Sequence, residues 1–119
     1  MILGIGVDTV DIARFTRQLE RTPALRARLF SRAEAELSIP SLAARFAAKE
    51  ALIKALGGSG ALAWRDLEVV RDRDRAPSFV ETDGLVGVFA GRGVARVHLS
   101  MTHDAGTATA FVVLEADTQ

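Results

Sequence analysis

A helix that is apolar on nearly every side is the feature that most constrains how this chain can fold. The segment SLAARFAAKEALIKAL, residues 41–56, is rich in strong helix formers and ends at Gly57 and Gly58, as helices often do. A helix of this kind is stable only when other elements cover most of its circumference. The chain has 119 residues, which is room for one core, so we expect one domain, residues 1–119, built around this helix.

Strands are predicted on either side of the central helix in the sequence. Residues 2–8 alternate so that Gly4, Gly6 and Asp8 share one face, and the two glycines leave that face open to a ligand or another backbone. A hairpin is predicted from residues 67–71 and 78–81. The last strand pair is predicted at residues 94–101 and 108–115, joined by a turn at 102–106.

The remaining segments are predicted to be short helices. The first spans residues 10–21 with Thr9 as its N-cap, the second begins at Pro23, the third has a capping box at Ser31, and the last has Asp83 as its N-cap. This order of elements predicts an α+β fold in which a largely antiparallel sheet packs with the long buried helix.

Composition excludes several classes of function. The formal net charge is zero, which argues against nucleic acid and against an anionic membrane surface as partners. The chain has no cysteine, so disulfides, thiolate metal sites and cysteine nucleophiles are excluded. No apolar run approaches the roughly 20 residues of a membrane span, and the N-terminus lacks the basic region of a signal peptide. We therefore expect a cytoplasmic protein.

Two carboxylates stand out as candidate site residues. Asp8 lies where the first strand ends, although a charge that favours the following helix dipole would explain it equally. Glu50 lies in the middle of the most apolar helix, where a lone carboxylate must pair, neutralise or bind a metal. Lys49, Glu50 and Lys54 fall within one arc of that helix, since successive residues are about 100° apart. This arc is either a solvated polar face with an ordinary ion pair or a site for a metal and phosphates.

Other polar residues have weaker signals. His103 is expected in the turn between the last two strands, where a histidine is usually a hydrogen-bonding loop residue. Arg14, Arg17 and Arg21 recur on one face of the first helix, opposite its apolar stripe. That basic stripe is either a solvated face or a docking surface for an acidic partner.

The order of these segments resembles a known family. Residues 4–8, Gly-Ile-Gly-Val-Asp, are similar to the opening motif of the holo-[acyl-carrier-protein] synthases, the small homotrimeric members of the 4'-phosphopantetheinyl transferase superfamily. Residues 45–51, RFAAKEA, with Lys54 and Ala55, resemble their most specific motif, and residues 99–103, LSMTH, resemble their third. The three motifs are in register, so the resemblance covers essentially the whole chain.

The resemblance implies an enzyme that transfers 4'-phosphopantetheine from coenzyme A to a serine of acyl carrier protein, with Mg²⁺ held by Asp8 and Glu50. It implies a homotrimer with coenzyme A between subunits, and an acidic carrier protein docked on Arg14, Arg17 and Arg21. The catalytic residues it implies are Asp8, Glu50, Lys54 and His103. The coenzyme contacts it implies are Arg45, Lys49, Lys54, Pro77, Ser100 and His103.

Two segments depart from the family pattern. Many members have Gly-Lys-Pro where this chain has Arg75-Ala76-Pro77, and many have a lysine and an aromatic residue where it has Ala105-Gly106-Thr107. The first departure weakens the expectation of adenine contacts at residues 75–77. At residues 105–107, phosphate contacts are expected to be reduced or supplied by arginine. The alternatives are a non-catalytic carrier-binding module of the same fold and a different metal-dependent phosphotransferase or hydrolase.

Overall fold

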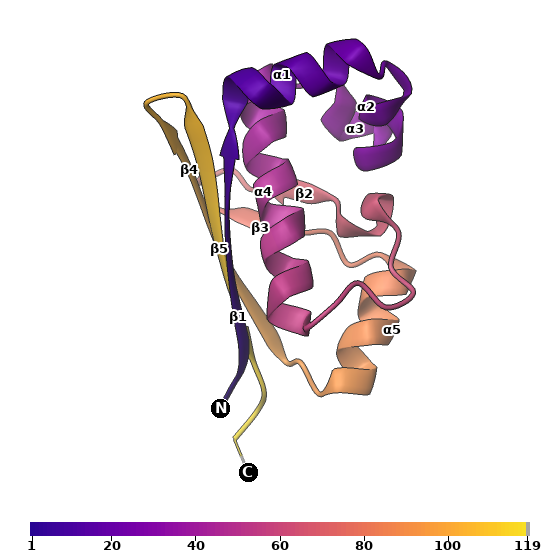
Figure 1. The fold of residues 1–119 in the computed structure, drawn as a ribbon. Helices are drawn as coiled ribbons and strands as arrows, with labels where there is room; N and C mark the ends of the chain where they lie inside the picture. The colour runs from indigo at the N-terminus through magenta and orange to yellow at the C-terminus, as the bar shows by residue number, and fades with distance from the viewer. Residues whose placement is uncertain (119) are drawn as a thin grey trace.

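The computed structural model describes residues 1–118, and in it the first and last strands of the chain pair with each other (Figure 1). In chain order the elements are β1 (Ile2–Asp11), α1 (Ile12–Arg21), α2 (Ala24–Leu29), α3 (Arg32–Ala35), α4 (Ile39–Leu56), the 3₁₀ helix η1 (Trp64–Leu67), β2 (Val69–Arg71), β3 (Pro77–Phe79), α5 (Asp83–Arg92), β4 (Arg96–Asp104) and β5 (Thr107–Glu115). None of the helices in this part of the chain is long and apolar enough to cross a bilayer.

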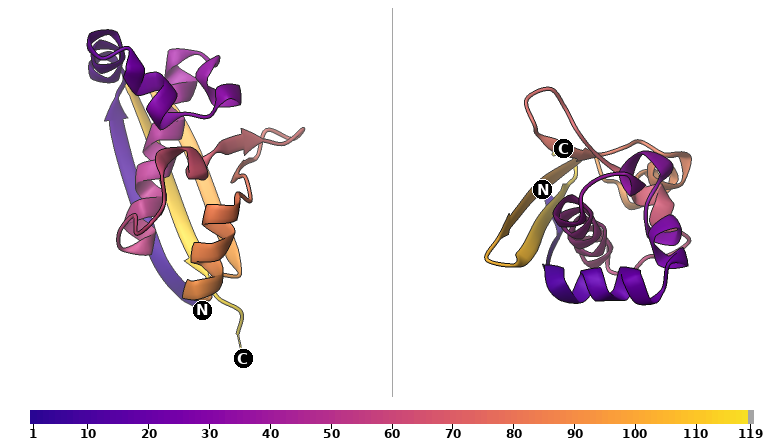
Figure 2. Two further views of the ribbon diagram at one scale, coloured as in Figure 1. Left: turned by 90° about the vertical axis from the view of Figure 1, so that its right-hand side faces the viewer. Right: turned by 90° about the horizontal axis from the view of Figure 1, so that it is seen from above.

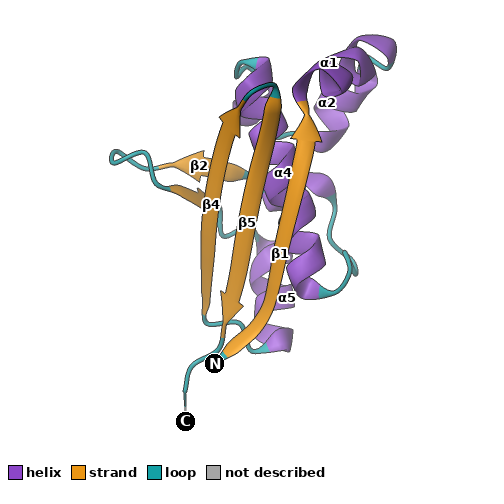
Figure 3. Cartoon of the chain, turned by 60° about the vertical axis from the view of Figure 1, so that its left-hand side comes forward, coloured by secondary structure: helices purple, strands orange, loops and turns teal. Residues whose placement is uncertain are grey.

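The main sheet has three antiparallel strands, with β5 between β1 and β4 (Figure 3). Alternate residues of β5 are buried on the face that packs against the helices: Ala108, Ala110, Val112 and Leu114. Directly opposite residues share a face, so the pairing of Asp8 with Ala110 turns the Asp8 side chain toward the helices as well. The predicted α+β class and antiparallel sheet are confirmed.

The long helix α4 packs on the inner face of β1 and β5 at very short range. Two glycines make this possible, because a Cβ atom at Gly4 would collide with the carbonyl oxygen of Ala55, and one at Gly6 with that of Ala51. The open face predicted at these glycines is therefore filled by another backbone. Gly57, with φ +82°, ends the helix in the left-handed conformation, as the sequence predicts.

Helices α1, α2 and α3 cover the N-terminal half of α4 and form a second part of the core. Phe15 and Leu19 are the buried residues of α1, and Phe15 stacks on Phe46 of α4 with ring centroids 5.4 Å apart. The predicted N-cap, Thr9, is wrong. β1 continues to Asp11 because it pairs with β5 as far as Thr107, and the Asp11 carboxylate then accepts the amide of Arg14.

The last hairpin is longer than predicted and its turn is shorter. β4 reaches Asp104, and only Ala105 and Gly106 form the turn, with φ of +51° and +80°. Two consecutive positive φ values match the right-handed twist of the strands in a two-residue hairpin loop. His103 is consequently a paired strand residue opposite Ala108, and the prediction that it lies in a loop is wrong.

The short strands β2 and β3 form a separate hairpin whose turn projects from the body of the molecule (Figure 2). It is preceded by η1, which takes up Leu67 of the predicted strand, and is followed by α5. Thr82, rather than the predicted Asp83, caps α5 by accepting the amide of Leu85.

Candidate active site

The close contact between β1 and α4 brings Asp8 to the middle of α4. Two residues of strand cover about 6.6 Å and four residues of helix about 6 Å, so the two elements advance nearly in step. With Gly4 against Ala55 and Gly6 against Ala51, Asp8 lies one helical turn further along α4, in the neighbourhood of Glu50. The missing side chains of the two glycines thus set the distance between strand and helix at this point.

Lys54, one helical turn after Glu50 in α4, bonds to β1. Its Nζ donates to Asp8 Oδ1 at 3.0 Å and to the Val7 carbonyl at 3.0 Å. The side chain of Asp8 is 18% exposed and that of Lys54 is 54% exposed, so the pair lies at the surface with its acid partly sheltered. The favourable i, i+4 pair predicted between Glu50 and Lys54 is replaced by this contact with the strand.

Glu50 shares a cavity of about 350 Å³ with Asp8, Asp11 and Arg14. Burial raises the pKa of the Glu50 carboxyl, the negative charge of Asp8 raises it further, and Lys54 opposes both. Two acids that repel each other across an accessible cavity form a place where a cation would be stabilised.

The donor set fits Mg²⁺. This ion takes oxygen ligands and is usually held by one or two carboxylates, with phosphates and water completing the shell. Among residues 1–118 no group of three or more His, Cys, Asp or Glu side chains could form a closed protein cage for a metal. Asp8 and Glu50 supply two carboxylates and leave the other positions open, which suits a metal that also contacts a substrate.

His103 lies on the far edge of the sheet from this cavity. His103 faces the same side of the sheet as Asp8. It pairs with Ala108, Ala108 pairs with Val10, and Val10 shares a face of β1 with Asp8. The strand that carries it, β4, is separated from β1 by β5, which puts it roughly 10 Å away across the sheet. Within one chain the structure therefore brings together Asp8, Glu50 and Lys54, and leaves His103 apart.

Ser100 lies on the opposite face of the sheet. It pairs with Phe111, whose side chain is exposed on the outer face, and Ser100 is exposed there too. The two residues of the LSMTH motif that were predicted to bind coenzyme, Ser100 and His103, thus project to different sides of β4.

Lys49 is not in the cavity with Glu50, and the prediction that it contacts phosphates is wrong. Its side chain is 0% exposed and its Nζ lies 2.7 Å from Oε1 of Glu34, itself 1% exposed. Successive residues of a helix point about 100° apart, and here that rotation turns Lys49 into the core while Glu50 faces the cavity. The predicted polar arc is therefore divided between a buried network and a surface site.

Arg45 lines a second cavity, of about 330 Å³, together with Arg71, Arg75 and Glu34. Its guanidinium donates to the carbonyls of Val69 and Ser41. Burial lowers the pKa of Arg45, Glu34 opposes this shift, and the nearby charges of Arg71 and Arg75 add to it. The three arginines outnumber the two acids of the hollow, Glu34 and Glu68, so its excess positive charge is suited to an anion. Pro77 begins β3 of the same hairpin and pairs with Arg71.

Sequence reasoning missed two residues of this region. Arg71 gave no signal beyond its place in a charged hairpin, and only the fold brings it to Arg45. Glu34 was recognised as the acid of a capping box, which the structure confirms, but such acids are usually exposed and its complete burial left no trace in the local sequence.

The three arginines of α1 are all exposed. Arg14 lines the cavity of Asp8 and Glu50, while Arg21 lines a neighbouring hollow with Gln18, Phe46 and Trp64. The predicted basic stripe therefore begins at the carboxylate cavity and leads away from it along α1.

Known proteins share both the sequence and this fold. The model of the 4'-phosphopantetheinyl transferase superfamily matches residues 4–111. A holo-[acyl-carrier-protein] synthase of Clavibacter michiganensis is 64% identical over 98% of each chain. The crystal structure of that synthase from Neisseria meningitidis superposes with a TM-score of 0.89 at 35% identity, covering 97% of this chain and 99% of the other. The Helicobacter pylori synthase in complex with coenzyme A superposes with a TM-score of 0.82 at 31% identity, covering 93% and 99%.

Proposed function

This chain belongs to the holo-[acyl-carrier-protein] synthases of the 4'-phosphopantetheinyl transferase superfamily, and from that premise we propose that it transfers the 4'-phosphopantetheine group of coenzyme A to a serine of apo-acyl carrier protein. The observation that carries the proposal is the cavity in which Asp8 and Glu50 face each other beside Lys54. A carboxylate pair with an adjacent ammonium is suited to a metal-bound diphosphate.

The reaction is a phosphoryl transfer in which no oxidant or reductant is needed. The oxygen of the carrier serine forms a bond to the β-phosphorus of coenzyme A, and the bond from that phosphorus to the oxygen bridging the two phosphates breaks. Adenosine 3',5'-bisphosphate leaves, and the serine proton is transferred to a base. The negative charge that develops on the transferred group and on the leaving phosphate must be neutralised.

Asp8 and Glu50 are the residues proposed to hold Mg²⁺, which would neutralise charge on the diphosphate when bound. The ammonium of Lys54 has three N–H donors, and two of them bond to Asp8 and to the Val7 carbonyl. These bonds hold the ammonium beside the cavity, where its third donor would meet a phosphate oxygen. The raised pKa of Glu50 is expected to fall when a cation replaces the repulsion from Asp8. The base is Asp8, Glu50 through a water, or His103.

The cavity of Arg45, Arg71 and Arg75 is the proposed site for phosphate on the nucleotide end of coenzyme A. The positive charge of the cavity supports this role. Part of that charge is Arg75, from the segment Arg75-Ala76-Pro77 that departs from the family pattern. Pro77 would lie beside the adenosine. In this way arginine supplies the positive charge that lysine supplies in many members.

A homotrimer is proposed as the active form. The outer face of β1 and β5 has an uncovered apolar part, with Ile5 opposite Val113 and Val7 opposite Phe111, and Ile5 is 60% exposed. Faces of this kind are typical of contact surfaces between protein molecules. Coenzyme A in a cleft between subunits would also let His103 of one copy meet Asp8 and Glu50 of another. That arrangement accounts for their separation within one chain.

The exposed stripe of Arg14, Arg17 and Arg21 is the proposed docking surface for the acidic carrier protein. Its place beside the cavity supports this, because a carrier seated there would have its serine within reach of the diphosphate. We also propose a cytoplasmic location.

The test is to incubate the protein with apo-acyl carrier protein, coenzyme A and Mg²⁺, and to measure the mass of the carrier. Transfer adds one phosphopantetheine to the carrier, and chelation of Mg²⁺ should prevent it. A non-catalytic carrier-binding module would bind the carrier without changing its mass, and a hydrolase would consume coenzyme A without modifying the carrier. Either outcome would overturn the proposal.

A further inference from the structure

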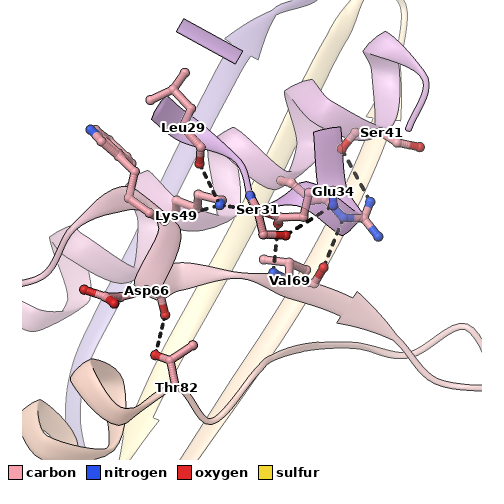
Figure 4. Close-up of polar contacts among 10 residues, drawn as sticks. Leu29, Ser31, Glu34, Ser41, Lys49, Asp66, Val69 and Thr82 are labelled. Carbon is pink, nitrogen blue, oxygen red and sulfur yellow. Dashed lines mark hydrogen bonds and ion pairs between the residues drawn. The ribbon is translucent and has the colours of Figure 1, made fainter. Parts of the chain in front are cut away.

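The buried pair of Lys49 and Glu34 forms a network that the proposed chemistry does not use (Figure 4). The ammonium of Lys49 donates to Glu34 Oε1 at 2.7 Å, to the Leu29 carbonyl at 2.8 Å and to the Trp64 carbonyl at 3.3 Å. These three bonds use all the protons that an ammonium has. Lys49 therefore ties α4 to the end of α2, to α3 and to η1.

Glu34 extends the network to the projecting hairpin. Its Oε1 also accepts the amide of Ser31, and its Oε2 accepts the amide of Val69, the first residue of β2, at 2.9 Å. The carbonyl of Val69 in turn accepts Nε of Arg45 at 3.3 Å. Both polar backbone groups of Val69 are thus held by charged side chains, one from α3 and one from α4.

The hairpin that begins at Val69 is anchored at its base, where Val69 is buried in the core and Phe79 packs against it, and its turn lies away from that anchor. β2 and β3 share only three residue pairs, and an isolated two-stranded hairpin is at best marginally stable in water. Yet Arg71 and Arg75, which line the cavity with Arg45, both belong to this hairpin. The relative position of the three guanidinium groups therefore depends on how Val69 is held.

Stability alone is a poor explanation for a fully buried ion pair. Desolvation of the two charges offsets most of their attraction, and apolar residues of the same volume often replace such pairs without loss of stability. A fully hydrogen-bonded network does fix geometry, because every donor and acceptor in it is already directed at a partner.

We propose that Glu34 and Lys49 are positioning residues for coenzyme A: through Val69 and Arg45 they hold the three arginines of the second cavity in place for the 3'-phosphate on the nucleotide end. This inference rests on the proposed function for the identity of the anion. Glu34 borders the cavity but is 1% exposed, with its carboxylate bonded to Ser31, Lys49 and Val69, so both residues act through other residues. Their effect is confined to the nucleotide end of the coenzyme.

The experiment measures ligand binding and not turnover, so that it gives a result even if no carrier is modified. The binding of adenosine 3',5'-bisphosphate and of adenosine 5'-monophosphate, which lacks the 3'-phosphate, is measured by calorimetry. The variant is the double substitution Glu34→Gln with Lys49→Met, which removes both buried charges at nearly constant volume. Lys49→Met alone is the second variant in case the double substitution does not fold, because the remaining Glu34 carboxyl can be protonated and can still accept the amide of Val69.

The double variant should bind the bisphosphate about tenfold more weakly, as expected for the loss of one well-placed charged contact, and should bind the monophosphate as the unsubstituted protein does. Lys49→Met alone should show a smaller loss of the same kind, because the bond from Val69 to Glu34 remains. Phe30→Leu is the matched control, because it weakens the core beside Lys49 without removing a hydrogen bond of the network, and the ratio of the two affinities should stay unchanged.

Two outcomes would overturn the inference. One is an equal loss for both nucleotides, which would mean that the network supports the fold in general. The other is unchanged binding of the bisphosphate by a folded double variant. Failure of the proposed function has a different signature, because the unsubstituted protein would then leave the carrier mass unchanged whatever the nucleotides do.

Discussion

At the scale of single residues, Asp8 and Glu50 differ in how the chain holds them. Asp8 is paired with Lys54 at 3.0 Å, whereas Glu50 has its pKa raised by burial and by Asp8. Both are proposed metal ligands, so Asp8→Ala and Glu50→Ala should each lower the rate of transfer by about a hundredfold or more at saturating coenzyme A. The rate is measured from the mass of the carrier protein, with circular dichroism to verify the fold. Near-normal activity of Glu50→Ala in Mg²⁺ would contradict the site assignment.

The raised pKa of Glu50 predicts that the residue destabilises the metal-free protein although the proposed function needs it. The pKa of Glu50 in the folded protein lies above its ordinary value of 4.5. At neutral pH the ionised carboxylate therefore lowers the free energy of unfolding. Below pH 4.5 the carboxyl is protonated in the folded and the unfolded protein alike, and this destabilisation disappears. Glu50→Gln should therefore raise the thermal midpoint in metal-free buffer at neutral pH, and the difference should shrink as the pH falls toward 4. Mg²⁺ should stabilise the unsubstituted protein more than the variant. A variant that is less stable at neutral pH would contradict this account.

At the scale of elements, the site depends on the contact between β1 and α4. Gly6→Ala would place a Cβ against the carbonyl of Ala51, and because both groups belong to backbones neither can move aside locally. The substitution should lower the free energy of unfolding by about 3 kcal/mol and reduce activity by displacing Asp8. Urea denaturation measures the first effect. Gly87→Ala is the control, since nothing lies near its Cβ in α5, and it should stabilise the protein by about 0.5–1 kcal/mol.

Helix α1 carries the prediction on partner recognition. Replacing Arg14 and Arg21 by glutamate turns attraction into repulsion at the proposed docking surface, and should raise the KM for the carrier at least about tenfold at low salt with little change in the KM for coenzyme A. Added salt should narrow the gap between the variant and the unsubstituted protein. The control is the replacement of Arg32 and Arg65, exposed residues of α3 and η1, by glutamate. It changes the net charge by the same amount and should leave the KM for the carrier and the KM for coenzyme A unaltered. Equal changes in the two constants for the α1 variant would mean that the stripe does not recognise the carrier.

The elements were predictable where one local rule decided them. The helix at 41–56, its end at Gly57 and the capping box at Ser31 all follow from short patterns, and the structure confirms them. The errors arose where distant segments decide. Thr9 continues a strand because β5 pairs with it, and His103 is in a strand because the turn needs only two residues. Lys49 resembled a surface lysine because its partner Glu34 lies 15 residues away in sequence and in another helix.

At the scale of the whole molecule, the uncovered sheet face predicts the assembly state. Ile5 lies on the apolar outer face of β1, so Ile5→Glu should convert a trimer into monomers at micromolar concentration, as measured by light scattering. The monomer should also lose transfer activity, because His103 would no longer meet the Asp8 of another copy. Val86→Glu, at an apolar residue of α5 with 49% exposure, is the matched control and should remain trimeric. Monomers of the unsubstituted protein would contradict the proposed assembly.

The pairing of β1 with β5 also determines when the active site can form during synthesis. β1 has no other neighbour in its sheet, and the side chains that meet across the pair, such as Thr9 and Thr109, are 100 residues apart in sequence. Asp8 is thus translated early but has no partner strand until residues 107–115 have left the ribosome. Pairings of such long sequence separation form slowly, since the intervening chain must first be ordered. A nascent chain would therefore neither consume coenzyme A nor occupy a carrier protein before β5 has been translated.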